Sequence, residues 1–160
     1  MMKQTNDQEI LARDEAFMRL ALAEAEKAAC AGEPPVGAVV VVDGRVVAAD
    51  RNRREATGDI TAHAELLAVR AASMAAKDWR LGDATVYITL EPCPMCAGAL
   101  LAARVGRIVY GAKDAVAGAM GSVLNLPRFP LGSSPIVTAG VLEAECREIL
   151  QRFFKEKRKK

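Results

Sequence analysis

The chain reads Thr-Ala-His-Ala-Glu over residues 61–65 and Glu-Pro-Cys-Pro-Met-Cys over residues 91–96, and these two stretches decide the fold that we expect. The first contains His63, the one histidine of the chain, and the second contains Cys93 and Cys96. Imidazole and thiolate are typical zinc ligands, and a structural zinc site uses four protein ligands. Three ligands therefore predict one catalytic zinc ion per chain, with its fourth position open to solvent.

Glu65 follows His63 at a spacing of two residues. Residues two apart on a helix do not share a face, so Glu65 should not bind the same ion beside His63. Cys93 and Cys96 are three apart at a predicted helix start, where they share a face and the helix dipole favours thiolates. We expect Glu65 to be the catalytic residue, a general acid and base for a water at the open position.

Two other interpretations of the cysteines stay open. A Cys-x-x-Cys pair in a reducing compartment can be a redox pair. A structural zinc site could instead recruit Cys30 or Cys146 as a fourth ligand. Cys146 falls on an apolar helical stripe, and Cys30 lies near the end of the first predicted helix, so both positions indicate packing.

Hydrophobic periodicity and turn residues predict an α/β protein. We expect residues 1–12 to be a loose lead-in. A hairpin with a turn at Asp43-Gly44 should come before alternating helices and strands, which predicts a three-layer α/β/α sandwich with a mixed five-stranded sheet. The predicted helices are 14–31, 61–76 with Thr61 as N-cap, 94–103 and 143–155; the predicted strands are 36–42, 46–49, 84–90, 108–110 and 135–138.

Composition limits the other possibilities. A chain of 160 residues with 51% apolar residues suits one folded domain. Neither an N-terminal signal pattern nor an apolar run of about 18 residues is present, so we expect a cytoplasmic protein with no membrane partner. The net charge is only +2, but residues 155–160 form a basic tail. That tail is either a solvated helix end or a phosphate-binding segment.

The spacing His-x-Glu with Pro-Cys-x-x-Cys is the zinc signature of nucleobase deaminases. The chain resembles one family in particular, the tRNA-specific adenosine deaminases of the cytidine/deoxycytidylate deaminase superfamily. The resemblance covers residues 14–158 and extends beyond the zinc motif. Its other segments are 35–38, 79–81, 104–112, the Gly-rich 118–122 and Phe153-Phe154.

The resemblance implies a single zinc-dependent deaminase domain over residues 1–160 with a cytidine deaminase-like fold. It implies a hydrolase that converts the wobble adenosine of a tRNA anticodon to inosine, with the anticodon stem-loop as partner and a homodimer as assembly. Zinc would be held by the three ligands named above, with Glu65 catalytic. The substrate-binding residues it implies are Asn52 for the target nucleotide, Asp114 for the nearby ribose or backbone, and Phe153 for the flanking bases.

Three features depart from the family pattern: Ile60 stands where many members have Pro, Pro94 is also common in guanine- and cytosine-type deaminases, and 125–135 lacks the usual polar contacts. The alternative function is a free-base or nucleoside deaminase with the same zinc chemistry. A zinc-dependent RNA-binding module is a further alternative, but pure binding has no use for a carboxylate beside an open zinc position.

Overall fold

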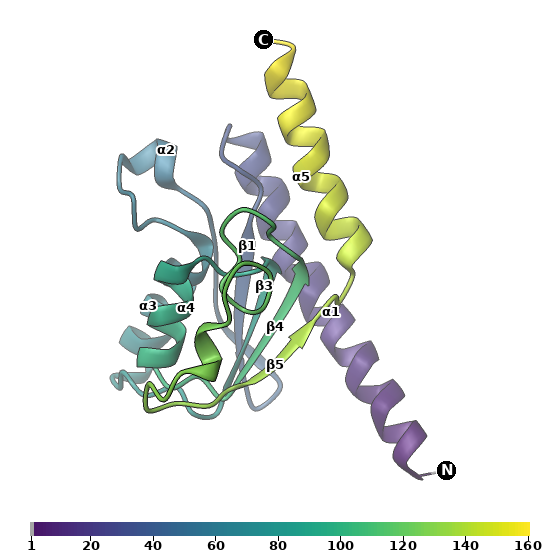
Figure 1. Ribbon diagram of the computed structural model, residues 1–160, viewed down its shortest axis with the longest axis vertical. Coiled ribbons are helices and arrows are strands. Elements are labelled where there is room, and N and C mark those ends of the chain that lie inside the picture. Colours follow the sequence, from purple (N-terminus) through teal and green to yellow (C-terminus); the bar gives the residue numbers. More distant parts are fainter. Residues whose placement is uncertain (1) are drawn as a thin grey trace.

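The computed structural model describes residues 2–160, in which five strands are covered by helices on both sides (Figure 1). Its helices are α1 (Met2–Cys30), α2 (Arg54–Thr57), α3 (Ala64–Ala76), α4 (Pro94–Ala102) and α5 (Glu143–Arg158), with a 3-10 turn, η1 (Leu126–Arg128). Its strands are β1 (Gly37–Val42), β2 (Arg45–Arg51), β3 (Ala84–Leu90), β4 (Arg107–Ala112) and β5 (Ile136–Ala139).

The strands form one mixed sheet in the order β2-β1-β3-β4-β5. β1 pairs with β2 and with β3 in antiparallel fashion, while β4 is parallel to both β3 and β5. The β1–β2 hairpin turns at Asp43-Gly44, where both residues have positive φ as this turn requires. The predicted mixed five-stranded sheet is therefore confirmed.

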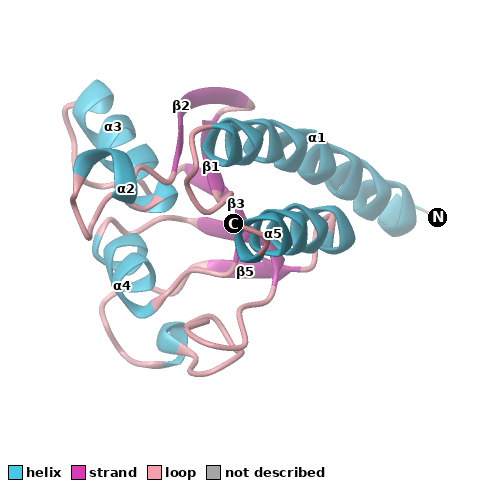
Figure 2. Cartoon of the chain, turned by 90° about the horizontal axis from the view of Figure 1, so that it is seen from above, coloured by secondary structure: helices cyan, strands magenta, loops and turns pink. Residues whose placement is uncertain are grey.

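Alternate residues of the central strands point to opposite faces of the sheet, as the period of two requires. Val40 and Val86 pack with α3 and α4, whereas Val39, Tyr87 and Val109 pack with α1 and α5. Figure 2 shows the two pairs of helices on opposite sides of the strands. The predicted three-layer α/β/α sandwich is confirmed, and both faces of the sheet are buried.

Helix α1 lies unusually close to β1 because a glycine separates them. A Cβ atom on Gly37 would overlap the carbonyl oxygen of Ala21 and crowd the backbone nitrogen of Ala25. The backbone nitrogen of Gly37 donates to the hydroxyl of Thr89 on β3 at 3.1 Å. Gly37 therefore allows α1 to lie close to β1, and its hydrogen bond to Thr89 ties β1 to β3.

A buried ion pair fastens the same helix to the sheet. Asp14 of α1 is only 2% exposed and accepts two hydrogen bonds from Arg107 of β4, at 2.7 and 2.6 Å. It also accepts the hydroxyl of Tyr87 at 2.8 Å. Burial, followed by the hydrogen bond to Asp14, raises the pKa of Tyr87 to about 12, so its hydroxyl remains a donor.

Several predicted boundaries need correction. The lead-in predicted for residues 1–12 is helical from Met2 onward, while Met1 lies outside the described residues. Helix α3 begins after His63, not after Thr61, whose hydroxyl instead donates to Asp59. The short helix α2 was not predicted, and α5 continues to Arg158 into the basic tail. None of the helices described between residues 2 and 160 has the combination of length and apolar character that a membrane span requires.

The Asp14 pair generates a stability prediction. Asp14→Asn leaves a largely buried guanidinium without its carboxylate, and breaking a buried pair in this way costs about 3–5 kcal/mol of unfolding free energy. Urea denaturation followed by circular dichroism measures the loss. The matched control is Glu26→Gln, which breaks the exposed contact between α1 and Arg152 of α5 and should leave the midpoint unchanged. Equal midpoints for the two variants would contradict this assignment.

Candidate active site

The predicted zinc ligands come from the starts of two helices. His63 is the N-cap of α3 and Cys93 is the N-cap of α4, each with extended backbone and no side-chain capping bond. Pro94 occupies the start of α4, where the absent N–H costs nothing. β3 delivers Cys93 to this position, and Cys96 follows within the first turn. Both helix starts therefore present side chains and positive partial charge to one point.

The three side chains meet at distances that suit zinc. Nδ1 of His63 lies 3.8 Å from Sγ of Cys93 and 3.5 Å from Sγ of Cys96, and all three ligand atoms lie within 4.8 Å of one another. Tetrahedral zinc with bonds of about 2.0–2.3 Å places such atoms about 3.6–3.8 Å apart. Among the described residues this is the one such cluster, and Cys30 and Cys146 are not in it.

The pKa values of all three side chains are shifted, because these groups share protons at the place where a cation would bind. A hydrogen bond from Cys96, with help from His63, lowers the pKa of Cys93 to about 4, so that sulfur is a thiolate. The same hydrogen bond and burial raise the pKa of Cys96. The hydrogen bond to Cys93 likewise raises the pKa of His63. A metal ion would take the place of the protons that these ligands share.

Glu65 lies beside the cluster and is only 5% exposed. Its Oε2 atom is buried without a hydrogen-bond partner in the described part of the chain. Burial raises the pKa of this carboxyl group. A buried polar atom without a partner is costly, so its retention indicates a role toward a ligand. The donor set and this free oxygen together fit a zinc ion with an open position, as the sequence predicted.

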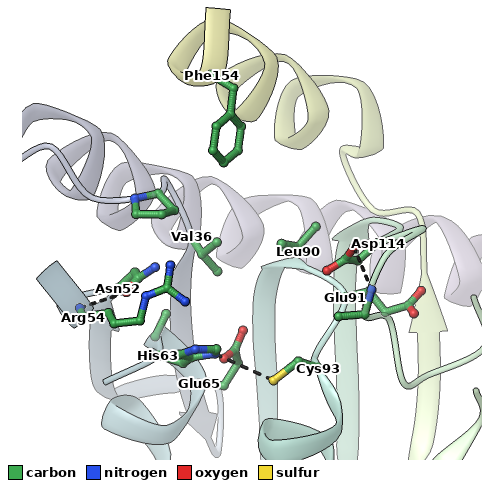
Figure 3. Close-up of a pocket in the computed structure, with 13 residues that line it drawn as sticks. Val36, Asn52, Arg54, His63, Glu65, Leu90, Glu91, Cys93, Asp114 and Phe154 are labelled. Carbon is green, nitrogen blue, oxygen red and sulfur yellow. Dashed lines mark hydrogen bonds between the residues drawn. The ribbon is translucent and has the colours of Figure 1, made fainter. Parts of the chain in front are cut away.

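His63, Glu65 and Cys93 line a cavity of about 230 Å³ (Figure 3). Asn52 and Asp114, two of the predicted substrate contacts, line its walls. Phe153, the third predicted contact, does not line the cavity. Its side chain lies on the face of α5 that is next to α1, near Ala29. Phe154 lines the cavity instead, and Figure 3 shows its ring pointing from α5 toward the site.

The two polar wall residues are held by their own loops. Oδ1 of Asn52 accepts the backbone N–H of Arg54 at 3.0 Å, which leaves its amide nitrogen as a donor for a ligand. Oδ1 of Asp114 accepts the N–H groups of Val116 and Ala117 at 2.9 and 3.2 Å. Both are anchored by one oxygen only, so each keeps a polar atom for substrate.

Sequence reasoning missed four residues of this site. Arg54, Phe154 and the buried Glu91 line the cavity, and Glu33 is buried next to the lining residue Pro34. The carboxylate of Glu33 accepts the N–H groups of Glu55 and Ala56 at the start of α2. In the sequence, Glu33 is only part of a helix-terminating segment. Its partners are more than 20 residues away, so no local pattern could identify them.

The sequence matches the family of the cytidine and deoxycytidylate deaminase zinc-binding region over residues 11–112. The tRNA-specific adenosine deaminase of Bacillus subtilis is 46% identical over 153 residues, which is 94% of each chain. The chloroplastic tRNA(adenine(34)) deaminase of Arabidopsis thaliana is 46% identical over 158 residues. The match covers 88% of this chain but only 12% of that longer protein.

A solved structure from a study of A-to-I editing by tRNA:A34 deaminases at the wobble position superposes with a TM-score of 0.82. It is 46% identical, and the match covers 84% of this chain and 99% of that one. Both the family match and these relatives include the segments that bring His63, Cys93 and Cys96 together. This chain therefore belongs to the cytidine and deoxycytidylate deaminase family and, within it, to the tRNA-specific adenosine deaminases.

Proposed function

We infer that this protein catalyses the hydrolytic deamination of adenosine to inosine at the wobble position of a tRNA anticodon. The observation that carries this conclusion is the buried Oε2 of Glu65, which has no partner among residues 2–160 and lies beside three zinc ligands, in a chain 46% identical to a tRNA-specific adenosine deaminase over most of its length. The reaction adds water at C6 of the adenine ring and breaks the C6–N bond, releasing ammonia.

His63, Cys93 and Cys96 would hold the zinc ion. When bound, zinc lowers the pKa of a water ligand to about 7, which supplies a nucleophile at neutral pH. Glu65 moves the protons: it accepts one from the attacking water and delivers it to the ring nitrogen, and it then carries the proton of the new C6 hydroxyl group to the leaving amine. Burial raises the pKa of Glu65, and this makes it a better proton acceptor than an exposed carboxylate.

The cavity suits one base removed from its stack. Its volume of about 230 Å³ is below the range of about 300–1,000 Å³ typical of drug-sized ligands. An unpaired loop base reaches such a pocket at low cost, because no base pair has to open. We propose that Asn52 donates to the target nucleotide and that Asp114 meets its ribose or backbone.

Aromatic and basic groups on α5 support a nucleic-acid partner. Phe154 is 42% exposed and lines the cavity, so we propose that it stacks on a flanking base. The predicted contact of Phe153 with flanking bases stays a prediction. Phe153 packs edge-on against Phe154, with 5.3 Å between the two ring centroids, and can support the ring of Phe154. The basic tail, residues 155–160, begins within the same helix, which ends at Arg158, and would meet backbone phosphates.

Three further expectations remain proposals. Residues 1–160 would form a single zinc-dependent deaminase domain. Its one sheet is packed with a hydrophobic cluster on each face. A homodimer is supported by exposed apolar side chains on α4 and in the following loops, among them Met95, Val123 and Phe129. A cytoplasmic location would bring the enzyme to its tRNA partner.

A substrate comparison tests the function. The zinc-loaded protein should convert adenosine to inosine in an anticodon stem-loop that carries the wobble adenosine. Free adenine, guanine, cytosine and their nucleosides should react at least about a hundredfold more slowly in kcat/KM, because binding energy from the loop is lost. Chelation should abolish the reaction and zinc should restore it. Faster turnover of a free base or nucleoside than of the stem-loop would support the alternative deaminase class.

The two phenylalanines of α5 generate a second prediction. Phe154→Ala should raise KM for the stem-loop by about fivefold or more, which corresponds to the loss of one base–aromatic stack. Phe153→Ala serves as the matched variant one residue away and should raise KM less, because its ring faces α1. Steady-state kinetics at constant salt measure both. A larger effect of Phe153→Ala would favour the residue that the sequence indicated.

A further inference from the structure

Glu91 is a buried acid at the edge of the active site that the deamination mechanism does not use. It is only 1% exposed, follows the last residue of β3 and precedes the zinc ligand Cys93 by two positions. It lines the cavity but does not belong to the three-residue metal cluster (Figure 3). Burying a carboxylate without partners costs several kcal/mol, so its contacts should explain its place.

Both hydrogen bonds from Ser122 to the Glu91 carboxylate come from the segment that carries Asp114, residues 114–122, which we term the Asp114 loop, and Tyr110 of β4 adjoins the same carboxylate. Oε1 of Glu91 accepts the hydroxyl of Ser122 at 2.6 Å, and Oε2 accepts the backbone N–H of Ser122 at 3.3 Å. Gly118 lies directly against the carboxylate, where a Cβ atom would overlap Oε2 of Glu91. The carboxylate is therefore enclosed by the loop on two sides.

The neighbours of Glu91 in sequence complete the attachment. The carbonyl of Pro92 accepts the N–H of Ala119 at 2.8 Å, and within the loop the carbonyl of Asp114 accepts the N–H of Gly118 at 3.0 Å. Three consecutive residues thus serve two tasks: Glu91 and Pro92 hold the Asp114 loop, and Cys93 is a zinc ligand. The position of the loop is tied directly to the position of the metal site.

We propose that Glu91 is a positioning residue that sets the place of Asp114 relative to the metal site, and through it the preference for a ribose-bearing nucleotide in RNA over a free base. The inference rests on the proposed function, because it requires Asp114 to meet the substrate. Hydrogen bonds to a charged acceptor are about twice as strong as neutral ones, so the pair with Ser122 can hold a glycine-rich segment in one arrangement. Without it, Asp114 is displaced while the zinc ligands stay in place.

Ser122 offers the cleanest test, since its side chain is exposed and its replacement leaves Glu91 intact. Ser122→Ala should lower kcat/KM for the anticodon stem-loop about tenfold, mainly through KM, as expected for the loss of one hydrogen bond to a charged group. Zinc content and the thermal midpoint should not change. Ser122→Thr, which keeps the hydroxyl, should restore activity, and Ser134→Ala is a matched control at a serine remote from the loop's contacts.

Gly118→Ala should act in the same direction, because its methyl group meets both the carboxylate of Glu91 and the backbone carbonyl of Asp114. A double-mutant cycle then separates positioning from general stabilisation. If Glu91 acts through Asp114, Ser122→Ala should cost little in an Asp114→Asn background, so the two losses should not add. A merely structural bond would lower activity equally in both backgrounds.

Each of these measurements either supports or overturns the positioning role of Glu91. Unchanged kinetics of Ser122→Ala, fully additive losses, or no effect of Asp114→Asn alone would overturn the inference while leaving the proposed function in place. The wild-type protein tests that function separately: failure to deaminate the stem-loop would refute both. If Gly118→Ala does not fold, the serine and aspartate variants still give the complete cycle.

Discussion

The convergence of two helix N-termini on one point is the constraint on which the rest of the structure depends. α3 and α4 begin at residues that are themselves zinc ligands, so the sheet must place the end of β3 beside the segment that precedes α3. The strand order meets this requirement, because β1 and β3 are neighbours and α3 packs against both. The helix dipoles then favour thiolates where a cation will bind.

Buried carboxylates surround this point, and their different contacts give them different roles. Glu33 and Glu91 are satisfied by N–H and O–H donors from the two walls of the cavity, so each stabilises a wall. Glu65 has one oxygen with no partner in the described residues. Protein interiors rarely leave such an atom unpaired, and an active site is the usual exception. The same side-chain type is therefore structural at two positions and chemical at the third.

The local motifs predicted the metal ligands, Glu65 and the order of strands and helices, because helix starts and turns are encoded by neighbouring residues. The contacts that decide the cavity wall are long-range, and the sequence could not show them. Phe153 illustrates the limit: it continues the apolar stripe of Cys146 and Ile149, so packing against α1 rotates Phe154 toward the cavity. The two phenylalanines differ by one helical step of about 100°, so the stripe that places Phe153 against α1 leaves Phe154 facing the cavity.

The most direct measurement of the central claim is single-turnover deamination of an anticodon stem-loop by Glu65→Gln, with zinc content and RNA affinity measured on the same sample. The amide keeps the size of the side chain but cannot accept the proton of the attacking water. The account predicts a rate reduced by about 10²–10⁴ or more, with one zinc per chain and RNA binding retained. A rate near that of the wild-type protein in a zinc-loaded, RNA-binding variant would contradict the assignment of Glu65 as the group that moves the proton.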